Sequence, residues 1–291
     1  MTERPSQEEI KKRVLEDRPS FTVPVDLPEN PAPARDSATV ILVRDGAGGP
    51  EVFMLERHLK SDFAGGAYVF PGGTIDARDL DPEAASFLDG PSLVEATTHI
   101  DAPEGTALGF YLCAIRETFE EAGVLLAHRS GEPVRFDDDE EEKRFAVYRD
   151  EFNARGGSLA ELATKEELRF AGDLLYYYAR WITPEFAPKR YDARFFVATM
   201  PEGQVPLHDD VETTASTWIR PSDALSQARE GLFSIIFPTR KTLESLADFA
   251  TANDVIASTR GKHIPAVLPT VVLSDGQAKV VLPGDATLHE P

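Results

Sequence analysis

The sequence has little that could cross-link the chain or anchor it in a membrane. Its 291 residues include one cysteine, Cys113, so no disulfide can form within the chain, which fits a reducing compartment. No stretch approaches the roughly 20 apolar residues of a membrane-spanning helix. The polar N-terminus also lacks the apolar core of a signal peptide. We therefore expect a cytoplasmic protein that has no membrane partner.

Positive charge is also scarce. The chain has 30 Lys and Arg against 50 Asp and Glu, a formal net charge of −20. Such a surface repels phosphate backbones, so we expect no nucleic-acid partner.

The 42% hydrophobic content can bury one large core. We predict a partly disordered N-terminal arm at residues 1–37, one domain at 38–260 and a C-terminal extension at 261–291.

Local patterns predict a mixed α+β domain. Strands are expected where β-rich runs are bounded by turn residues, and helices where apolar residues recur every three or four positions. The expected strands are Ala38–Val43, Glu51–Glu56, Ala67–Phe70, Leu174–Ile182, Arg194–Met200 and Trp218–Arg220. The expected helices are Pro82–Leu88, Phe145–Phe152, Leu159–Leu168, Pro221–Arg229 and Thr239–Ala250.

The C-terminal extension contains two further β runs, Thr270–Leu273 and Ala278–Leu282. They are joined through Ser-Asp-Gly-Gln, a strong hairpin signal. An isolated hairpin is not stable in water. We therefore expect this one to pack on the domain or to form a homodimer contact.

The most informative stretch is Arg116-Glu117-Thr118-Phe119-Glu120-Glu121-Ala122-Gly123-Val124. At about 100° per residue, one helix stripe is apolar and the three glutamates lie opposite it. Gly123 favours a left-handed stop, and Asp101 with Glu104 could cap the start. The apolar stripe consists of Leu108, Leu112, Ile115, Phe119 and Ala122.

A solvated charged face is the simpler interpretation of this helix, since Arg116 and Glu120 are also spaced for an i,i+4 ion pair. The turn Phe70-Pro71-Gly72-Gly73 favours a functional interpretation instead. Its two glycines allow the backbone to turn a carbonyl toward a ligand.

Together these stretches resemble the box of the Nudix hydrolases, G-x5-E-x7-R-E-U-x-E-E-x-G-U, where U is a bulky aliphatic residue. Arg116 to Val124 match its second half, with Thr118 in place of the first aliphatic. The 42 residues from 74 to 115 stand where the pattern has 13, which leaves an insert of 29, at about residues 77–105. Counted back from Arg116, the box glutamate is replaced by Leu108, and Glu104 or Asp101 are possible substitutes.

A box interrupted by an insert is similar to the box of one branch of the Nudix superfamily. That branch includes the peroxisomal coenzyme A diphosphatases and bacterial relatives. The resemblance implies a mixed β-sheet sandwiched between helices. It implies that Glu117, Glu120 and Glu121 bind Mg²⁺ or Mn²⁺, that Gly72 offers its carbonyl and that Arg116 orients the cluster. Glu212 would complete the catalytic set.

The substrate implied by the resemblance is a nucleoside diphosphate linked to another moiety. Candidate phosphate-binding cations are Arg57, Lys189, Arg190 and Arg194, and Phe70 is a further candidate contact. The coenzyme A-type signature is matched at Arg57, at Gly66 and from Phe70 to Gly73, whereas His58 and Asp62 depart from it.

We therefore expect a metal-dependent diphosphatase, with coenzyme A or acyl-coenzyme A as the leading substrate. Two alternatives remain. One is the same chemistry on ADP-sugars, dinucleotides or nucleotides. The other is a regulatory domain that binds a nucleotide without turnover.

Overall fold

The computed structural model describes residues 30–59, 64–136, 138–209, 212–274 and 277–283. The expected N-terminal arm lies outside these ranges up to residue 29, and so does Asp62. Within the described ranges, none of the helices is both long enough and apolar enough to cross a bilayer.

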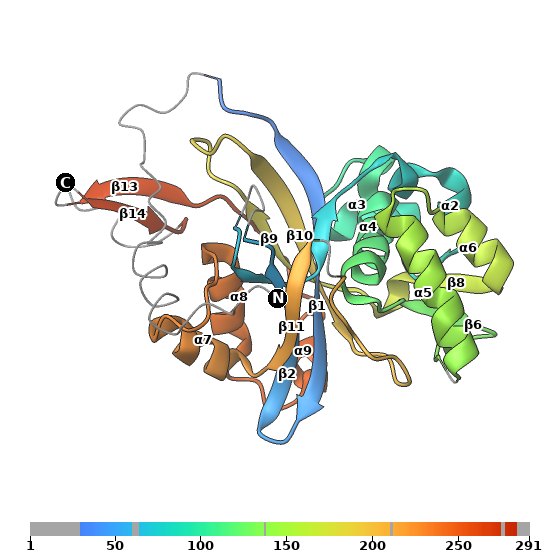
Figure 1. Cartoon of the computed structure of the whole chain (residues 1–291). Coiled ribbons are helices and arrows are strands. Elements are labelled where there is room, and N and C mark those ends of the chain that lie inside the picture. The colour runs from blue at the N-terminus through green and yellow to red at the C-terminus, as the bar shows by residue number, and fades with distance from the viewer. Residues whose placement is uncertain (1–29, 60–63, 137, 210–211, 275–276, 284–291) are drawn as a thin grey trace.

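A mixed sheet runs through the middle of the molecule (Figure 1). Its strands are β1 (Ala34–Gly46), β2 (Gly49–Arg57), β3 (Tyr68–Val69), β4 (Gly72–Thr74), β9 (Tyr176–Ile182), β10 (Arg190–Thr199), β11 (Thr213–Ile219) and β12 (Ala266–Val267). The order is β11-β2-β1-β10-β9-β12, with β3 paired to β2 and β4 to β1. β1 runs parallel to β10 and antiparallel to β2, so the predicted mixed sheet is confirmed.

The first two strands form a hairpin. Val43 lies opposite Val52, and Gly46 lies opposite Gly49 at the turn. β1 begins at Ala34, earlier than expected, because its first residues already pair with β10. The hairpin brings the end of β2 to the Gly-rich turn, as β3 and β4 flank that turn and pair with β2 and β1.

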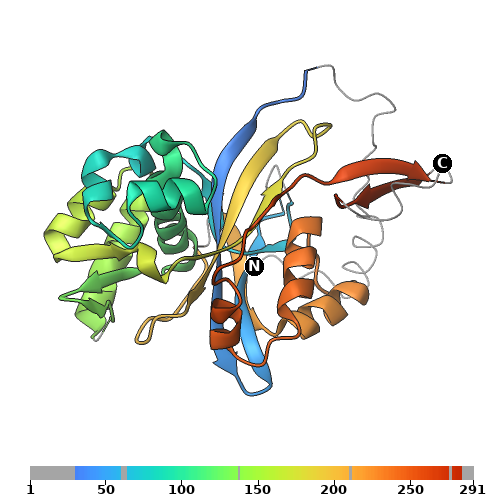
Figure 2. The ribbon, with the colours of Figure 1, turned by 180° about the vertical axis from the view of Figure 1, so that it is seen from behind.

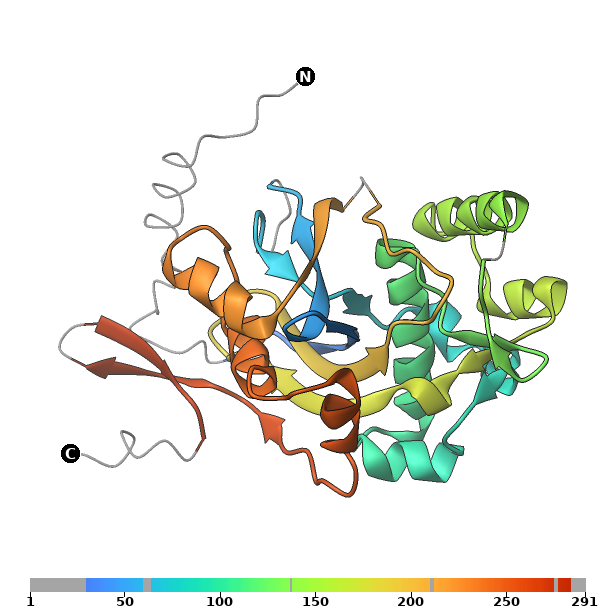
Figure 3. The same ribbon diagram turned by 90° about the horizontal axis from the view of Figure 1, so that it is seen from below.

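Helices cover both faces of this sheet (Figures 2 and 3). They are α4 (Glu104–Ala122) on one face and α7 (Pro221–Arg229), α8 (Phe237–Leu246) and α9 (Ala252–Ala257) on the other. Strand alternation supplies a core to each side. Val40 and Leu42 of β1 belong to the core cluster around α4, whereas Ile41 and Val43 belong to the cluster under α8 and α9.

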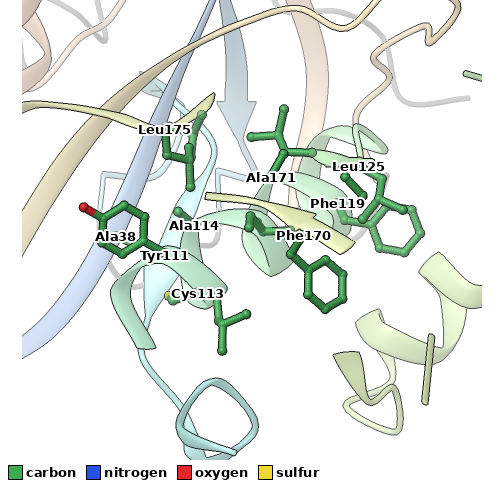
Figure 4. Packing of buried hydrophobic residues seen from close by; sticks show 14 of the residues in the cluster. Ala38, Tyr111, Cys113, Ala114, Phe119, Leu125, Phe170, Ala171 and Leu175 are labelled. Atoms are coloured by element: carbon green, nitrogen blue, oxygen red, sulfur yellow. The ribbon is translucent and has the colours of Figure 1, made fainter. Parts of the chain in front are cut away.

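The core beneath α4 is filled by large side chains. Tyr111, Cys113 and Phe119 of this helix lie in one cluster with Phe170 and Leu175 (Figure 4). Cys113 is fully buried and reduced, and burial raises the pKa of its thiol well above the usual range. This cysteine is therefore part of the core packing.

A helical lobe lies beside α4 at the right of Figure 1. It contains η1 (Ala77–Leu80), α2 (Pro82–Ser86), α3 (Leu93–His99), α5 (Asp139–Asn153) and α6 (Leu159–Glu166), together with β5 (Leu88–Asp89), β6 (Ala127–Arg129), β7 (Glu132–Pro133) and β8 (Leu168–Ala171). These four strands form a second sheet in the order β5-β8-β6-β7. The expected helix near Pro82 is confirmed as α2, whereas α3 and the second sheet were not predicted.

The C-terminal extension forms its predicted hairpin. β13 (Thr270–Ser274) and β14 (Gln277–Val281) pair antiparallel as a separate two-stranded sheet. The short strand β12 precedes this hairpin and runs parallel to β9, which attaches the extension to the central sheet. The hairpin itself projects away from the sheet in both side views (Figures 1 and 2). Its role as a dimer contact stays a prediction.

Candidate active site

The glutamate helix α4 ends where the sequence predicts, but its charged face is buried. Gly123 has a left-handed φ of 68°, and its N–H donates to the Phe119 carbonyl at 3.0 Å. Arg116 is only 2% exposed and Glu121 only 4%. The Gly-rich turn and η1 pack against this face of α4. The glutamates therefore lie between protein segments and are not on a solvated surface.

Arg116 is the centre of a buried ion-pair network. Its Nε and Nη2 lie 2.7 Å from Oδ1 and 2.7 Å from Oδ2 of Asp79, a bidentate pair. Its Nη1 lies 2.8 Å from Glu117 Oε1 and 2.9 Å from Glu120 Oε2. One guanidinium thus fixes three carboxylates, which fits the orienting role expected for Arg116.

Asp79 occupies the place of the missing box glutamate. It is the sixth residue after Gly73, which is where the family pattern has its glutamate when the box is counted forward. The insert therefore lies between Asp79 and Arg116, where the 36 residues from 80 to 115 replace seven. A forward count from Gly73 would have found this residue, whereas the backward count from Arg116 crosses the insert.

The substitutes expected from the backward count are wrong. Leu108 is half-buried and packs against the core. Glu104 is exposed at the start of α4, which follows Pro103 and has no side-chain cap, so the predicted cap is also wrong. Asp101 instead pairs with Arg180 at 2.8 Å.

The short helix η1 presents Asp79 to Arg116. Asp76 and Asp79 form a capping box, in which the Asp76 N–H donates to Asp79 Oδ2 at 2.9 Å. Arg78 pairs with Asp76 at 2.8 Å and reaches Glu120 Oε1 at 3.3 Å. Both carboxylate oxygens of Glu120 therefore face an arginine.

The two glycines of the turn allow it to touch the helix. The Gly72 N–H donates to Glu121 Oε2 at 2.9 Å. A Cβ at Gly73 would overlap the Glu117 carboxylate, and one at Gly72 would overlap the Ala38 carbonyl of β1. The structure thus shows the amide of Gly72 in contact with a helix glutamate, while the proposed use of its carbonyl stays a prediction.

Burial raises the pKa of all three helix glutamates, because removal from water disfavours the charged form. For Glu117, Arg116 opposes this shift and Glu120 adds to it, which leaves a pKa of about 7. The pKa of Glu121 lies well above its usual range, raised by burial and then by Glu117, while the Gly72 N–H lowers it. An added cation would favour the ionised form of the cluster.

Glu212 and Arg57 lie at the open side of this cluster. Arg57 Nη2 lies 3.6 Å from Glu212 Oε2, and the His58 N–H donates to the Glu212 carbonyl at 2.9 Å. Charges on both Arg57 and Glu212 act on the Glu121 carboxyl, so both are near it. The Glu212 side chain is 56% exposed. The predicted roles of Glu212 in catalysis and of Arg57 in phosphate binding stay predictions.

Three other residues that were predicted to bind substrate contact the protein itself. Arg194 is 1% exposed, donates to the carbonyls of Ile100 and Asp101, and stacks on a phenylalanine ring, so it fastens the linker before α4. Arg190 donates to the carbonyls of Thr183 and Ala32. Phe70 is 3% exposed in the core cluster beneath α8 and α9. Arg194 and Phe70 are therefore buried in the protein, whereas a substrate contact by Arg190 stays a prediction.

The donor set of the cluster fits a hard divalent cation, since carboxylate oxygens are the ligands that Mg²⁺ and Mn²⁺ prefer. In the parts of the chain that the structure describes, no group of three or more His, Cys, Asp or Glu side chains already surrounds one point. Arg116 binds one oxygen of Glu117 and one of Glu120, and the Gly72 N–H binds one oxygen of Glu121.

A pocket of about 390 Å³ lies elsewhere, over β11 and the start of α7. Its lining includes Tyr68, which stacks on Phe233, and the ion pair of Arg220 with Asp223. None of the four glutamates of the candidate site lines it. We place the chemistry at the glutamates because burial raises the pKa of their carboxyl groups. Shifted pKa values of this kind cluster at functional sites.

The fold and this site together define the protein as a Nudix hydrolase. The NUDIX hydrolase from Alicyclobacillus acidocaldarius superposes with a TM-score of 0.65 at 26% identity, over 78% of this chain and 96% of that one. A family model described as the NUDT19 Nudix domain matches residues 89–239, just over half of the 291. The chain therefore belongs to the NUDT19 Nudix-domain family, and Nudix hydrolases generally use divalent metal ions.

Two curated relatives are named acyl-coenzyme A diphosphatase NUDT19. The protein from Homo sapiens is 27% identical, over 82% of this chain and 72% of its own length. The one from Xenopus laevis is 25% identical, over 81% of this chain and 70% of its own.

Removing the carboxylate of Asp79 is expected to destabilise the protein strongly. Asp79→Ala leaves the Arg116 guanidinium buried without its bidentate partner, which typically costs about 3–5 kcal/mol. Urea unfolding measures the loss. The control is Glu202→Ala, which breaks a surface ion pair of an 87% exposed side chain and should cost less than about 1 kcal/mol. Equal, small losses in both variants would contradict the structural role of Asp79.

The two turn glycines should respond differently to a methyl group. Gly73→Ala displaces only the flexible end of Glu117, so we expect kcat to fall by at least about tenfold with little change in melting temperature. Gly72→Ala meets the β1 backbone and should lower the melting temperature by at least about 4 °C. Calorimetry and steady-state kinetics on both variants test this contrast, which a fully active Gly73→Ala enzyme would refute.

The raised carboxyl pKa values predict a pH-dependent stabilisation by Mg²⁺. Because Glu117 has a pKa of about 7 when folded and 4.5 as its ordinary value, the folded state binds more protons in that interval. The metal-free protein therefore loses stability as pH rises through it. Mg²⁺ favours the ionised carboxylates, so its effect on the melting temperature should be larger near pH 8 than near about pH 5. Equal shifts at both pH values would count against a metal site here.

Proposed function

We propose that the protein hydrolyses the diphosphate bond of coenzyme A or acyl-coenzyme A with the help of Mg²⁺ or Mn²⁺. The observation that carries this proposal is the buried cluster of three helix glutamates, oriented by Arg116 and closed by the Gly72-Gly73 turn. A pure nucleotide binder gains nothing from adjacent carboxylates that repel phosphate. The cluster therefore favours catalysis over regulatory binding.

Glu117, Glu120 and Glu121 would hold the metal. When bound, the metal neutralises charge on the diphosphate and lowers the pKa of water. In the reaction, the oxygen of water bonds to one phosphorus while the bridging P–O bond breaks, so each product keeps one of the two phosphates of the cleaved diphosphate. Arg116 fixes the orientation of the glutamate side chains. It does not face the substrate, since it is only 2% exposed.

Glu212 is the carboxylate that we assign as the general base, which accepts a proton from the attacking water. Its side chain is 56% exposed, whereas Glu117 and Glu120 are 12% and 13% exposed and bound by Arg116. Water can therefore reach Glu212 more easily. Glu117 is the second candidate because its pKa of about 7 suits a base at neutral pH.

Arg57 is the residue best placed to bind a substrate phosphate. Its Nε is buried, and within the described residues it has no hydrogen-bond partner. Its 3.6 Å distance to Glu212 is too long for a hydrogen bond. The guanidinium lies near the carboxylate of Glu121, and a guanidinium can fork onto a phosphate oxygen pair.

The choice of coenzyme A rests on the relatives and on the partial signature. The curated relatives are named acyl-coenzyme A diphosphatases, and Arg57, Gly66 and the Phe-Pro-Gly-Gly turn keep the spacing of the coenzyme A-type pattern. ADP-sugars and dinucleotides are the second candidates, since the same glutamates would serve any diphosphate.

A substrate comparison with variants tests the proposal. Acyl-coenzyme A with Mg²⁺ or Mn²⁺ should give 3′,5′-adenosine diphosphate, detected by chromatography, faster than ADP-ribose or a dinucleotide is cleaved. Glu120→Gln and Glu121→Gln should lower kcat by at least about 100-fold while both proteins stay folded, and Arg57→Ala should raise KM. Glu104→Gln, an exposed change on the same helix, is the control. Full activity of both glutamine variants would refute the metal assignment, and efficient cleavage of ADP-ribose alone would refute the substrate.

A further inference from the structure

We propose that Arg149 is a positioning residue that fastens the end of the catalytic helix to the loop carrying Glu212. Arg149 lies on α5, in the helical lobe, and neither the family motif nor the proposed function gives it a role. The inference rests on the proposed function, because it assumes that Glu212 takes part in the reaction.

The first half of this connection is at the C-terminus of α4. The last carbonyls of a helix have no partner inside it and need donors from elsewhere. Arg149 Nε donates to the Glu120 carbonyl at 2.9 Å, and its Nη2 donates to the Glu121 carbonyl at 2.8 Å. A Cβ at Gly123 would lie 3.0 Å from Arg149 Nη1, so the glycine that ends the helix also makes room for this guanidinium. Arg149 thus holds the backbone of two glutamates of the cluster.

The second half is the loop between β10 and β11. Arg149 Nη2 also donates to the Leu207 carbonyl at 2.8 Å, and the Leu207 N–H donates to the Ala122 carbonyl at 2.9 Å. One guanidinium therefore binds three carbonyls from two segments that are distant in sequence. An arginine can do this because its donors are fixed in a plane, whereas a lysine offers a single point charge.

The same loop is anchored on both sides of Leu207. Before it, the buried Gln204 accepts from the Leu125 N–H at 2.8 Å and donates to the carbonyls of Leu125 and Val134 at 3.0 and 2.8 Å. After it, the Asp209 carboxylate accepts from the N–H groups of Glu212 and Thr213 at 3.1 and 3.0 Å. Gln204 therefore holds the loop to the segment that follows the catalytic helix, while Asp209 holds the backbone at the start of β11.

This arrangement has a consequence for Glu212. The exposed Glu212 side chain lies 3.6 Å from Arg57. Its backbone is held by His58 and by Asp209 of this loop, so its position relative to Glu121 depends in part on the backbone of the loop. Arg149 is the side chain that binds both this loop and the Glu121 backbone. Loss of Arg149 should therefore change the position of Glu212 relative to Glu121.

The test is a double-mutant cycle of Arg149→Met with Glu212→Gln, with acyl-coenzyme A as the substrate. Loss of a residue that orients a reacting group typically costs about 10–100-fold in activity. We expect Arg149→Met to lower kcat by at least about tenfold in the wild-type background but by less than about twofold in the Glu212→Gln background. Arg149→Lys should recover only part of the loss. The control is Arg144→Met on the same helix, which pairs with Glu166 away from α4 and should keep wild-type kcat.

An equal loss in both backgrounds, or wild-type kcat in Arg149→Met, would overturn the positioning role alone. Wild-type kcat in Glu212→Gln would overturn both this inference and the assignment of Glu212. If Arg149→Met does not fold, the same cycle is run with Arg149→Lys.

A second measurement does not depend on activity. Hydrogen exchange followed by mass spectrometry should show faster exchange at residues 203–213 and 122–125 in the Arg149 variant than in Arg144→Met. Unchanged exchange in both segments would show that Arg149 does not hold the loop and would overturn the proposal.

Discussion

The buried pair of Arg116 and Asp79 is the contact on which the rest of the site depends. Charges without water are tolerable only when their hydrogen-bonding capacity is used by partners. Here the guanidinium donates to Asp79, Glu117, Glu120 and the Thr74 carbonyl. The pair joins the turn that follows β4 to the middle of α4, and it thereby sets the distance between the glycines and the glutamates.

The local parts of the structure could be predicted from the sequence because their causes are local. The Gly123 stop, the β1–β2 hairpin and α7 follow from residue pattern and turn chemistry alone. The environment of Arg194 could not be predicted, since its partners are two carbonyls in a linker about ninety residues away. Asp79 and α3 are intermediate cases. A forward count of the box from Gly73 indicates Asp79, and the Ser92/Glu95 capping box indicates the start of α3.

Arginines act as connectors throughout this acidic protein. Arg194 joins β10 to the linker before α4, and Arg180 reaches the same linker through Asp101. Arg116 joins the two halves of the box. Each of these three guanidiniums binds carboxylates or carbonyls of the protein. Their role is therefore to join segments of the fold and not to contact a ligand. Arg57, with its unused Nε, differs from them in this respect.

The contact between Asp79 and Arg116 also makes the length of the insert energetically unimportant. The two ends of the segment 80–115 are held side by side, so the segment is a closed loop whose entropic cost grows only with the logarithm of its length. Lengthening such a loop from seven residues to the 36 found here costs about 1.5 kcal/mol on that basis. That cost is small enough for the packing of α2 and α3 to offset. A box interrupted at this point can therefore gain or lose whole helices while the carboxylates stay where the reaction needs them.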